Sequence, residues 1–216
     1  MNVTQALAAR RSIRAFLSKP VEQEKLTAIF EAAARTPSWA NTQPWESFVA
    51  SGETLQRIKD GFRENYANGV AVVAETPRPI IADWSEAASR RRKQLHPGME
   101  RDCGEAAKEF GKLNQTLFHA PAVIYICMDR KHSQWSLYDI GAYAQSLMLA
   151  AVEQGLGTMP AVQLTNFPAL LHQELQIPES MQITIGIAVG YPDEEHGINL
   201  FRSERDSVEE TVHFFG

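Results

Sequence analysis

The chain of 216 residues contains only two cysteines, Cys103 and Cys127. Two thiols are too few for a disulfide framework, so we expect a reducing compartment such as the cytoplasm. No apolar run approaches the roughly 18 residues that a membrane helix needs. Residues 1–16 lack the apolar core of a secretory signal. The sequence therefore predicts a cytoplasmic protein with no membrane partner.

Motifs for metal and acyl-transfer chemistry are missing as well. The six histidines are scattered, without the HExxH or HxH spacing of a metal site. No GxSxG, GxGxxG or GxxxxGKS motif is present. The net charge is −5, which argues against nucleic-acid binding. The basic run Arg90–Lys93 is interpreted as a solvated helix face, because acidic residues interleave and no aromatic platform accompanies it.

The composition favours an ordinary packed domain. Hydrophobic residues make up 44% of the chain and charged residues 22%, a balance typical of globular proteins. We see no internal repeat, so we expect residues 1–216 to form a single domain. Apolar runs predict buried strands at 122–128 and 183–189, with extended pieces at 45–50 and 158–163. Helical spacing predicts helices near residues 2–10, from 20 onward, and over 55–66, 139–154 and 167–175.

Two apolar segments call for unusual burial. The predicted helix 139–154 is apolar on nearly all sides, which indicates a place in the core or in a subunit interface. The final stretch, 191–216, is polar and irregular but ends in Val212, Phe214 and Phe215. Such an end has to pack against the body of the protein or against another subunit.

Three segments carry residues that suit a bound anionic heteroaromatic molecule. Arg10–Arg14 offers three guanidinium groups and a hydroxyl that could clamp a phosphate; the alternative is a set of surface cations after a short helix. Residues 37–45 offer amides and indoles that could meet the edge and face of a ring; the alternative is an ordinary turn. Residues 190–205 add a late pair of arginines, and a solvated tail is the alternative there.

Together these segments resemble the nitroreductase family. The resemblance is carried by RRSIRAF at 10–16, PSWANTQPWE at 37–46 and GYPDEEHGINLFRSER at 190–205, in matching order and spacing. The run LYDIGAYAQSLMLAAVEQGLGTMP at 137–160 also resembles the family's central dimer helix and the strand after it. The likeness covers nearly the whole chain and is weakest over residues 64–114.

The resemblance implies an α+β nitroreductase-like fold, with a mixed, mostly antiparallel sheet flanked by helices. It also implies an interlocked homodimer with C-terminal strand exchange, in which the arm 191–216 reaches the partner subunit. Two FMN molecules would then lie at the dimer interface, each contacted by both chains. That arrangement would give the apolar end of the arm a place to pack.

Family positions that contact FMN are carried over only where this sequence matches. The matches for the phosphate are Arg10, Ser12 and Arg205, with Arg11 and Ser203 beside them and Arg202 as a weaker candidate. Arg14 matches a cation at the N1/O2 edge of the flavin ring. The matches for the loop from the other subunit are Pro37, Ser38 and Trp39, followed by the amides of Asn41 and Gln43. The matches for the segment along the flavin, which offers a backbone N–H to N5, are Pro160, Ala161, Val162 and Gln163. Asn114 lies one position away from an asparagine that a family member places at the pyrimidine edge.

The implied activity is an FMN-dependent oxidoreductase that uses NAD(P)H. Hydride would pass through flavin N5 to a nitroaromatic, quinone or similar conjugated acceptor by a ping-pong mechanism. The flavin carries the chemistry, so no protein residue is predicted to be catalytic. A flavin-dependent dehalogenase or enone reductase on the same scaffold, the flavin-fragmenting branch, and a flavin-binding dimer without turnover remain as alternatives. The choice between NADH and NADPH stays open.

Overall fold

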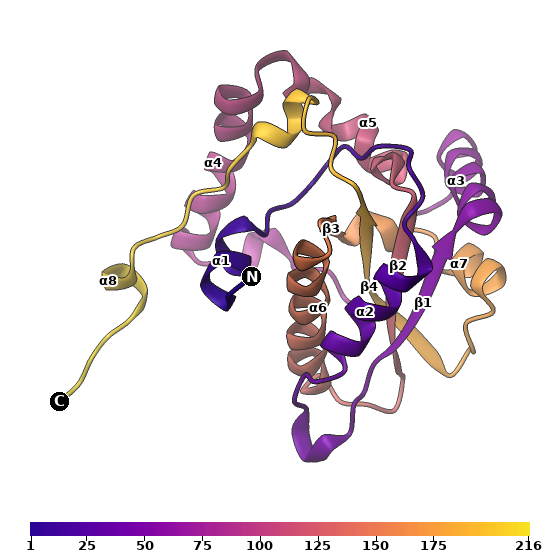
Figure 1. The fold of residues 1–216 in the computed structure, drawn as a ribbon, viewed down its shortest axis with the longest axis horizontal. Coiled ribbons are helices and arrows are strands. Elements are labelled where there is room, and N and C mark those ends of the chain that lie inside the picture. Colours follow the sequence, from indigo (N-terminus) through magenta and orange to yellow (C-terminus); the bar gives the residue numbers. More distant parts are fainter.

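A computed structural model describes residues 1–216 and is built around one four-stranded sheet (Figure 1). The strands are β1 (Glu46–Ser51), β2 (Ala122–Asp129), β3 (Gly157–Ala161) and β4 (Met181–Gly190), in the spatial order β1-β2-β4-β3. All three neighbouring pairs are antiparallel. One isolated parallel bridge, between Ser12 and Thr158, extends the sheet beyond β3.

Helices account for most of the remaining regular structure. The α-helices are α1 (Val3–Ala9), α2 (Gln23–Ala33), α3 (Gly52–Ala67), α4 (Glu86–Cys103), α5 (Phe110–Gln115), α6 (Ser136–Glu153), α7 (Pro168–Leu175) and α8 (Val208–Thr211). Short 3-10 turns are η1 (Trp39–Asn41), η2 (Ile81–Asp83), η3 (Gly104–Glu109), η4 (Leu117–His119), η5 (Val162–Thr165) and η6 (Gly197–Leu200). None of these helices combines the length and hydropathy needed to cross a bilayer.

Strand β2 explains why the sheet is covered on both faces. Side chains alternate along a strand, so a continuous apolar run supplies two apolar faces. Val123, Tyr125 and Cys127 join one buried cluster, whereas Ile124 and Ile126 join the other. The apolar runs at 122–128 and 183–189 therefore form the two central strands, as the sequence predicts.

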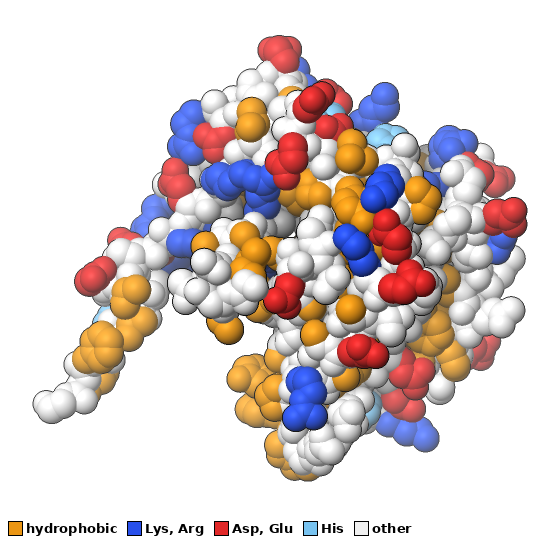
Figure 2. All heavy atoms as spheres, viewed as in Figure 1, with side chains coloured by type: hydrophobic (Ala, Val, Ile, Leu, Met, Phe, Trp, Pro, Cys, Tyr) orange, Lys and Arg blue, Asp and Glu red, His pale blue; other side chains and the backbone are white.

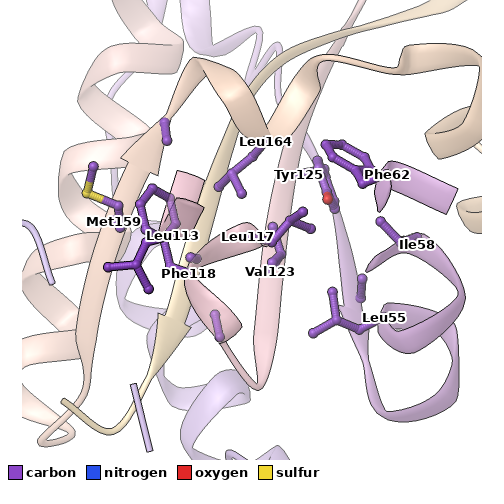
Figure 3. Packing of buried hydrophobic residues seen from close by; sticks show 14 of the residues in the cluster. Leu55, Ile58, Phe62, Leu113, Leu117, Phe118, Val123, Tyr125, Met159 and Leu164 are labelled. Carbon is purple, nitrogen blue, oxygen red and sulfur yellow. The ribbon is translucent and has the colours of Figure 1, made fainter. Parts of the chain in front are cut away.

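Different helices cover the two faces of the sheet. Residues of α2 and α6 form one cluster with the sheet, and Figure 1 shows both helices on the same side of it. The larger cluster draws on α3, α7, α4 and α5. Figure 3 shows Leu55, Ile58 and Phe62 of α3 lying toward Tyr125 of β2.

The predicted α6 is present, but this chain buries only one side of it. Its buried residues include Ile140, Leu147 and Ala151, whereas Trp135 and Tyr138 at its start are 66% and 75% exposed. The extended piece predicted at 158–163 ends earlier, at Ala161. A 3-10 turn follows, in which the Thr165 hydroxyl donates to the Val162 carbonyl at 2.9 Å.

The arm 191–216 begins inside the body of the protein, where Ile198 and Phe201 join the larger core cluster, and only its later part projects. It passes along α4, forms the short α8 and ends beyond the rest of the chain (Figure 1). Phe214 and Phe215 are 88% and 96% exposed, and Figure 2 shows apolar side chains along the projecting end. Within one chain the apolar end of the arm thus contacts no core.

Glu75 fastens the irregular segment between α3 and α4 to the edge of β4. Its carboxylate accepts from the Ile183 amide at 2.7 Å, lies 3.1 Å from His172 Nε2 and pairs with the guanidinium of Arg130. Burial raises the pKa of Glu75, but these hydrogen bonds outweigh burial and hold the pKa below its ordinary value of 4.5. The charged carboxylate therefore stabilises the fold at neutral pH.

We expect Glu75→Gln to lower the free energy of unfolding at pH 6 by about 1.5–3 kcal/mol, because charge-assisted hydrogen bonds are lost. A lowered folded-state pKa means that this stabilisation exists above pH 4.5 and disappears as the pH falls through the folded value. The difference between wild type and variant should therefore shrink by pH 3 in urea unfolding. Glu174→Gln is the control, since Glu174 is similarly buried but pairs with Arg57 alone. Equal effects of the two substitutions, or a gap that persists at pH 3, would contradict this role for Glu75.

Candidate functional site

The arginine segment follows α1 and runs beside β3. The side chain of Asn2 caps α1 by accepting from the Gln5 amide at 2.9 Å, and the helix ends at Ala9. The chain then becomes extended, and the Ile13 amide donates to the Thr158 carbonyl at 2.9 Å. Residues 10–14 are thereby held next to the strand that leads into Pro160–Gln163. The structure brings these two predicted parts of the site together.

Arg14 is a buried cation without an acidic partner. The residue is only 7% exposed, and no carboxylate forms an ion pair with its guanidinium. Nη1 donates to the Ser12 carbonyl at 3.1 Å, while Nε is buried without a hydrogen-bond partner. The guanidinium carbon lies 5.2 Å from the ring centre of Phe201 and 5.6 Å from that of Phe110. Burial lowers the pKa of Arg14, so an adjacent negative charge would relieve a real cost.

Arg10 and Arg205 form a pair of cations that, like Arg14, has no acidic partner. Burial, followed by the positive charge of Arg205, lowers the pKa of Arg10. Neither arginine has an acidic partner, whereas the neighbouring Arg11 pairs with Glu194 at 2.7 Å. Two like charges that approach each other without a carboxylate between them suit a bound dianion such as a phosphate.

Hydrogen bonds within the arm orient the late arginines. Arg205 Nη1 donates to the hydroxyl of Ser203 at 2.8 Å, which keeps these two predicted phosphate contacts adjacent. Arg202 is engaged differently, because its Nη1 donates to the carbonyls of Asn199, Leu200 and Phe201. That guanidinium closes η6, the turn that precedes it.

The loop at residues 37–43 is rigid and strained. The Ser38 hydroxyl accepts from the Gln43 amide at 2.9 Å, and the Gln43 side-chain amide donates to Asn41 Oδ1 at 3.3 Å. Ala40, Asn41 and Gln43 have φ values of 50°, 55° and 45°, a left-handed region that non-glycine residues rarely adopt. Pro37 and Trp39 are exposed, Trp39 at 68%. Strain of this kind persists where the surroundings enforce it, and it gathers at ligand sites.

This loop lies far from the arginine segment of the same chain. The Trp39 amide donates to Asp139 near the start of α6 at 3.2 Å, whereas Ser12 pairs with Thr158, just beyond the end of α6. Asp139 lies 14 residues before Glu153, the last residue of α6, so these two points are separated by roughly 21 Å along its axis. Figure 1 shows the loop and the arginine segment at opposite ends of α6.

The remaining predicted residues lie on β3, η5 and α5. Pro160 is half-buried and Ala161 is buried at the end of β3, while Val162 and Gln163 begin η5 and are exposed and half-buried. Asn114 is 8% exposed on α5, and its Nδ2 donates to the carbonyl of Phe110 at 3.0 Å. Because the Phe110 ring contacts Arg14, Asn114 lies close to the Arg14 site through its bond to Phe110. No group of three or more His, Cys, Asp or Glu side chains is arranged to hold a metal ion.

Comparison with known proteins decides the family. The sequence profile described as "Nitroreductase family" matches residues 7–191. The chain is 31% identical to a 4-nitrobenzoate reductase of Pseudomonas putida over 217 aligned positions, which cover 97% of this chain and 94% of the relative. It is 28% identical to a chloronitrobenzene nitroreductase of Comamonas testosteroni, with 95% and 93% covered. The chain belongs to the nitroreductase family.

Solved structures agree with this membership of the nitroreductase family. A mutant of the FMN- and NADPH-dependent nitroreductase NfnB from "sphigopyxis sp. strain HMH" superimposes with a TM-score of 0.92 at 28% identity. NfnB from Mycobacterium smegmatis, solved in complex with NADPH, gives 0.89 at 27% identity. Both comparisons cover 100% of each chain. The predicted nitroreductase-like α+β fold and an oxidoreductase activity of this family are therefore confirmed.

Sequence reasoning about this nitroreductase-family chain did not find the residues that surround Arg14. Phe110 and Phe201 contact its guanidinium, and Asn199 binds its backbone amide at 2.7 Å. These contacts join residues about 100 to 190 positions apart, so no local pattern reveals them. Asn199 and Phe201 both lie in the matched stretch 190–205, which is the one available signal, and it assigns neither residue a role.

Proposed function

We propose that this chain is an FMN-dependent, NAD(P)H-using nitroreductase. The proposal rests on two cationic sites that have no acidic partner. Arg10 and Arg205 form the first, and the buried Arg14, on the other side of Ser12 in the sequence, forms the second. One site suits a terminal phosphate and the other suits the edge of a ring that becomes negative on reduction. The relatives named above for FMN and NADPH support the same cofactor and donor here.

The residues present fit FMN at its phosphate end. A monoester phosphate needs two or three donors with net positive charge, and Arg10, Ser12, Ser203 and Arg205 offer these groups. Arg11, already paired with Glu194, lies beside them, and Arg202 remains the weaker candidate. A pyrophosphate usually binds at a glycine-rich turn, and the sequence has none. FMN is therefore favoured over FAD.

They also fit FMN at its ring end. The unpartnered Nε of Arg14 leaves a donor for a ring acceptor, and the charge of Arg14 favours a reduced ring with negative N1/O2. In our proposal Pro160, Ala161, Val162 and Gln163 lie along the ring. Asn114 approaches from α5, beside Phe110.

When bound, FMN supplies hydride acceptance at N5 and two-electron delivery to a conjugated acceptor. The chain's own residues hold the phosphate, orient the ring and stabilise negative charge. Donor and acceptor would use the same space over the ring, so we expect ping-pong kinetics. Relatives named for 4-nitrobenzoate and chloronitrobenzene support a nitroarene as acceptor; a quinone is the second acceptor class that we propose.

Anaerobic titration of the purified yellow protein with NADPH and with NADH tests this function. We expect the flavin absorbance to bleach with about one equivalent of donor per chain, and to return on addition of 4-nitrobenzoate. Each reduced flavin delivers two electrons, so the nitroso compound forms first and a second reduced flavin converts it to the hydroxylamine. Bleaching without reoxidation by nitroarenes or quinones would favour a flavin-dependent dehalogenase or enone reductase. Absence of bleaching by either donor would favour a flavin-binding dimer without turnover and would reject the proposal.

Arg205→Ala should weaken FMN binding by about tenfold to a hundredfold, since a charge-assisted contact contributes about 1.5–3 kcal/mol. Fluorescence titration of apoprotein with FMN measures this change, and riboflavin, which lacks the phosphate, should bind both proteins equally. Arg63→Ala serves as the control, because Arg63 is an exposed arginine of α3 that pairs with Asp60. Unchanged FMN affinity in Arg205→Ala would remove Arg205 from the site.

We further propose a homodimer with composite sites, in which the loop 37–43 serves the FMN held by the other chain. The separation of this loop from the arginine segment by most of the length of α6 supports the arrangement. The exposed residues Tyr138, Phe214 and Phe215 supply apolar surface that a second copy would cover. Residues 1–216 then form one FMN-binding domain, with the arm 191–216 exchanged between subunits. The two buried free thiols accord with the cytoplasmic location that we propose.

Mixed dimers test the composite site. One subunit carries Arg10→Ala with Arg205→Ala, and the other carries Asn41→Ala with Gln43→Ala. If the loop and the arginines meet across the interface, each mixed dimer regains one intact site of two, and FMN binds at half the wild-type stoichiometry. Each doubly substituted homodimer serves as the control with two impaired sites. Verified mixed dimers that recover no site would place both elements at FMN from the same chain.

A further inference from the structure

Asn199 joins the turn η6 to the arginine segment at Arg14 and Ala15 and to the nearby Asp193. It is 3% exposed in η6, and its amide uses all of its hydrogen-bonding capacity. Oδ1 accepts from the backbone amides of Arg14 at 2.7 Å and Ala15 at 3.3 Å. Nδ2 donates to the carbonyls of Ala15 at 2.8 Å and Asp193 at 2.9 Å. A buried amide with four partners is a rigid connection.

The Arg14 backbone depends on this amide more than its neighbours do. The residues on either side are held by main-chain hydrogen bonds, from the Ile13 amide to Thr158 and from the Leu17 amide to Tyr191, both at 2.9 Å. Between them, the amides of Arg14 and Ala15 donate to Asn199 alone. Loss of this acceptor would leave two buried amides unpaired, which the chain can relieve only by moving.

The same turn also contacts the Arg14 side chain. Phe201, two residues after Asn199, lies 5.2 Å from the guanidinium. Arg202 closes η6 by donating to the Asn199 carbonyl at 2.8 Å. The turn thus holds Arg14 at both the backbone and the guanidinium, while no acid fixes the side chain in place.

We propose that Asn199 is a positioning residue that sets the distance from the Arg14 guanidinium to the N1/O2 edge of the bound flavin. This inference rests on the proposed function. Charge–charge energy falls with distance, so a displaced Arg14 stabilises the reduced ring less. The oxidised ring is neutral at that edge and the phosphate contacts lie elsewhere, so binding of oxidised FMN is little affected.

Amide hydrogen exchange in the apoprotein tests the connection without the flavin. We expect the amides of Arg14 and Ala15 to exchange at least tenfold faster in Asn199→Ala, while those of β2 and β4 keep their protection. Asn199→Asp should restore part of the protection, since a carboxylate oxygen still accepts from both amides although the two donations from Nδ2 are lost. Unchanged protection of Arg14 and Ala15 in Asn199→Ala would overturn the inference. If Asn199→Ala does not fold, Asn199→Ser, with a shorter acceptor, replaces it in all measurements.

Midpoint potentials test the consequence for the flavin. We expect Asn199→Ala to lower the affinity for reduced relative to oxidised FMN by about threefold to tenfold, which is about 15–30 mV for a two-electron couple. In the Arg14→Gln background the same substitution should change this ratio by less than about 1.5-fold, because the charge that it positions is gone. Leu171→Ala is the control: it truncates a fully buried side chain of α7 and should leave the potential unchanged.

The outcomes separate this inference from the proposed function. Failure of wild-type protein to bind FMN, or an Arg14→Gln potential equal to that of wild type, would overturn the function or the role of Arg14, and the inference with it. Normal FMN binding and a responsive Arg14, together with an unshifted potential in Asn199→Ala, would overturn the inference alone. Equal shifts of the potential on Asn199→Ala with and without the Arg14 charge would also overturn the inference alone, because Asn199 would then affect the flavin independently of Arg14.

Discussion

The buried guanidinium of Arg14 is the interaction on which the candidate site depends. A charge removed from water is costly unless an opposite charge or a full set of acceptors replaces the lost hydration. Here one carbonyl and two aromatic rings face the group, and no carboxylate does. The chain tolerates this arrangement because Asn199 and the bridge between Ser12 and Thr158 fix the backbone on both sides of the guanidinium. In the proposed site, the flavin edge that becomes negative on reduction would balance this charge.

The architecture supports the proposal that a second subunit completes the site. Pairing with β4 holds β3 in the sheet, and β3 in turn holds the arginine segment through the bridge between Thr158 and Ser12. On the α6 side of the sheet, the loop 37–43 is tied to Asp139 near the other end of that helix. Within this chain, the strain of Ala40, Asn41 and Gln43 is held by hydrogen bonds inside the loop and by the contact of Trp39 with Asp139. In the composite site that we propose, the strained loop also presents its amides to a neighbouring copy.

Local patterns predicted what depends on local chemistry. The apolar runs became β2 and β4, the apolar helix became α6, and the order of three motifs identified the family. Local sequence patterns failed where contacts between distant residues determine the structure. Val162 and Gln163 belong to a 3-10 turn, in which the Thr165 hydroxyl contacts the Val162 carbonyl. Arg202 bonds to η6, and Asn199 binds a segment 185 positions away. The places of the predicted site residues around FMN stay predictions until binding is measured.

Reductive titration of Arg14→Gln, together with its affinity for oxidised FMN, tests the central claim most directly. Gln removes the charge but keeps hydrogen bonding and much of the length. Loss of about 1–2 kcal/mol of stabilisation corresponds to a two-electron midpoint about 20–45 mV more negative than that of wild type. The account predicts this shift with nearly unchanged affinity for oxidised FMN. An unshifted potential would contradict it. Constant affinity would then mark Arg14 as a cation without a role in binding, and lower affinity would mark it as a further phosphate ligand.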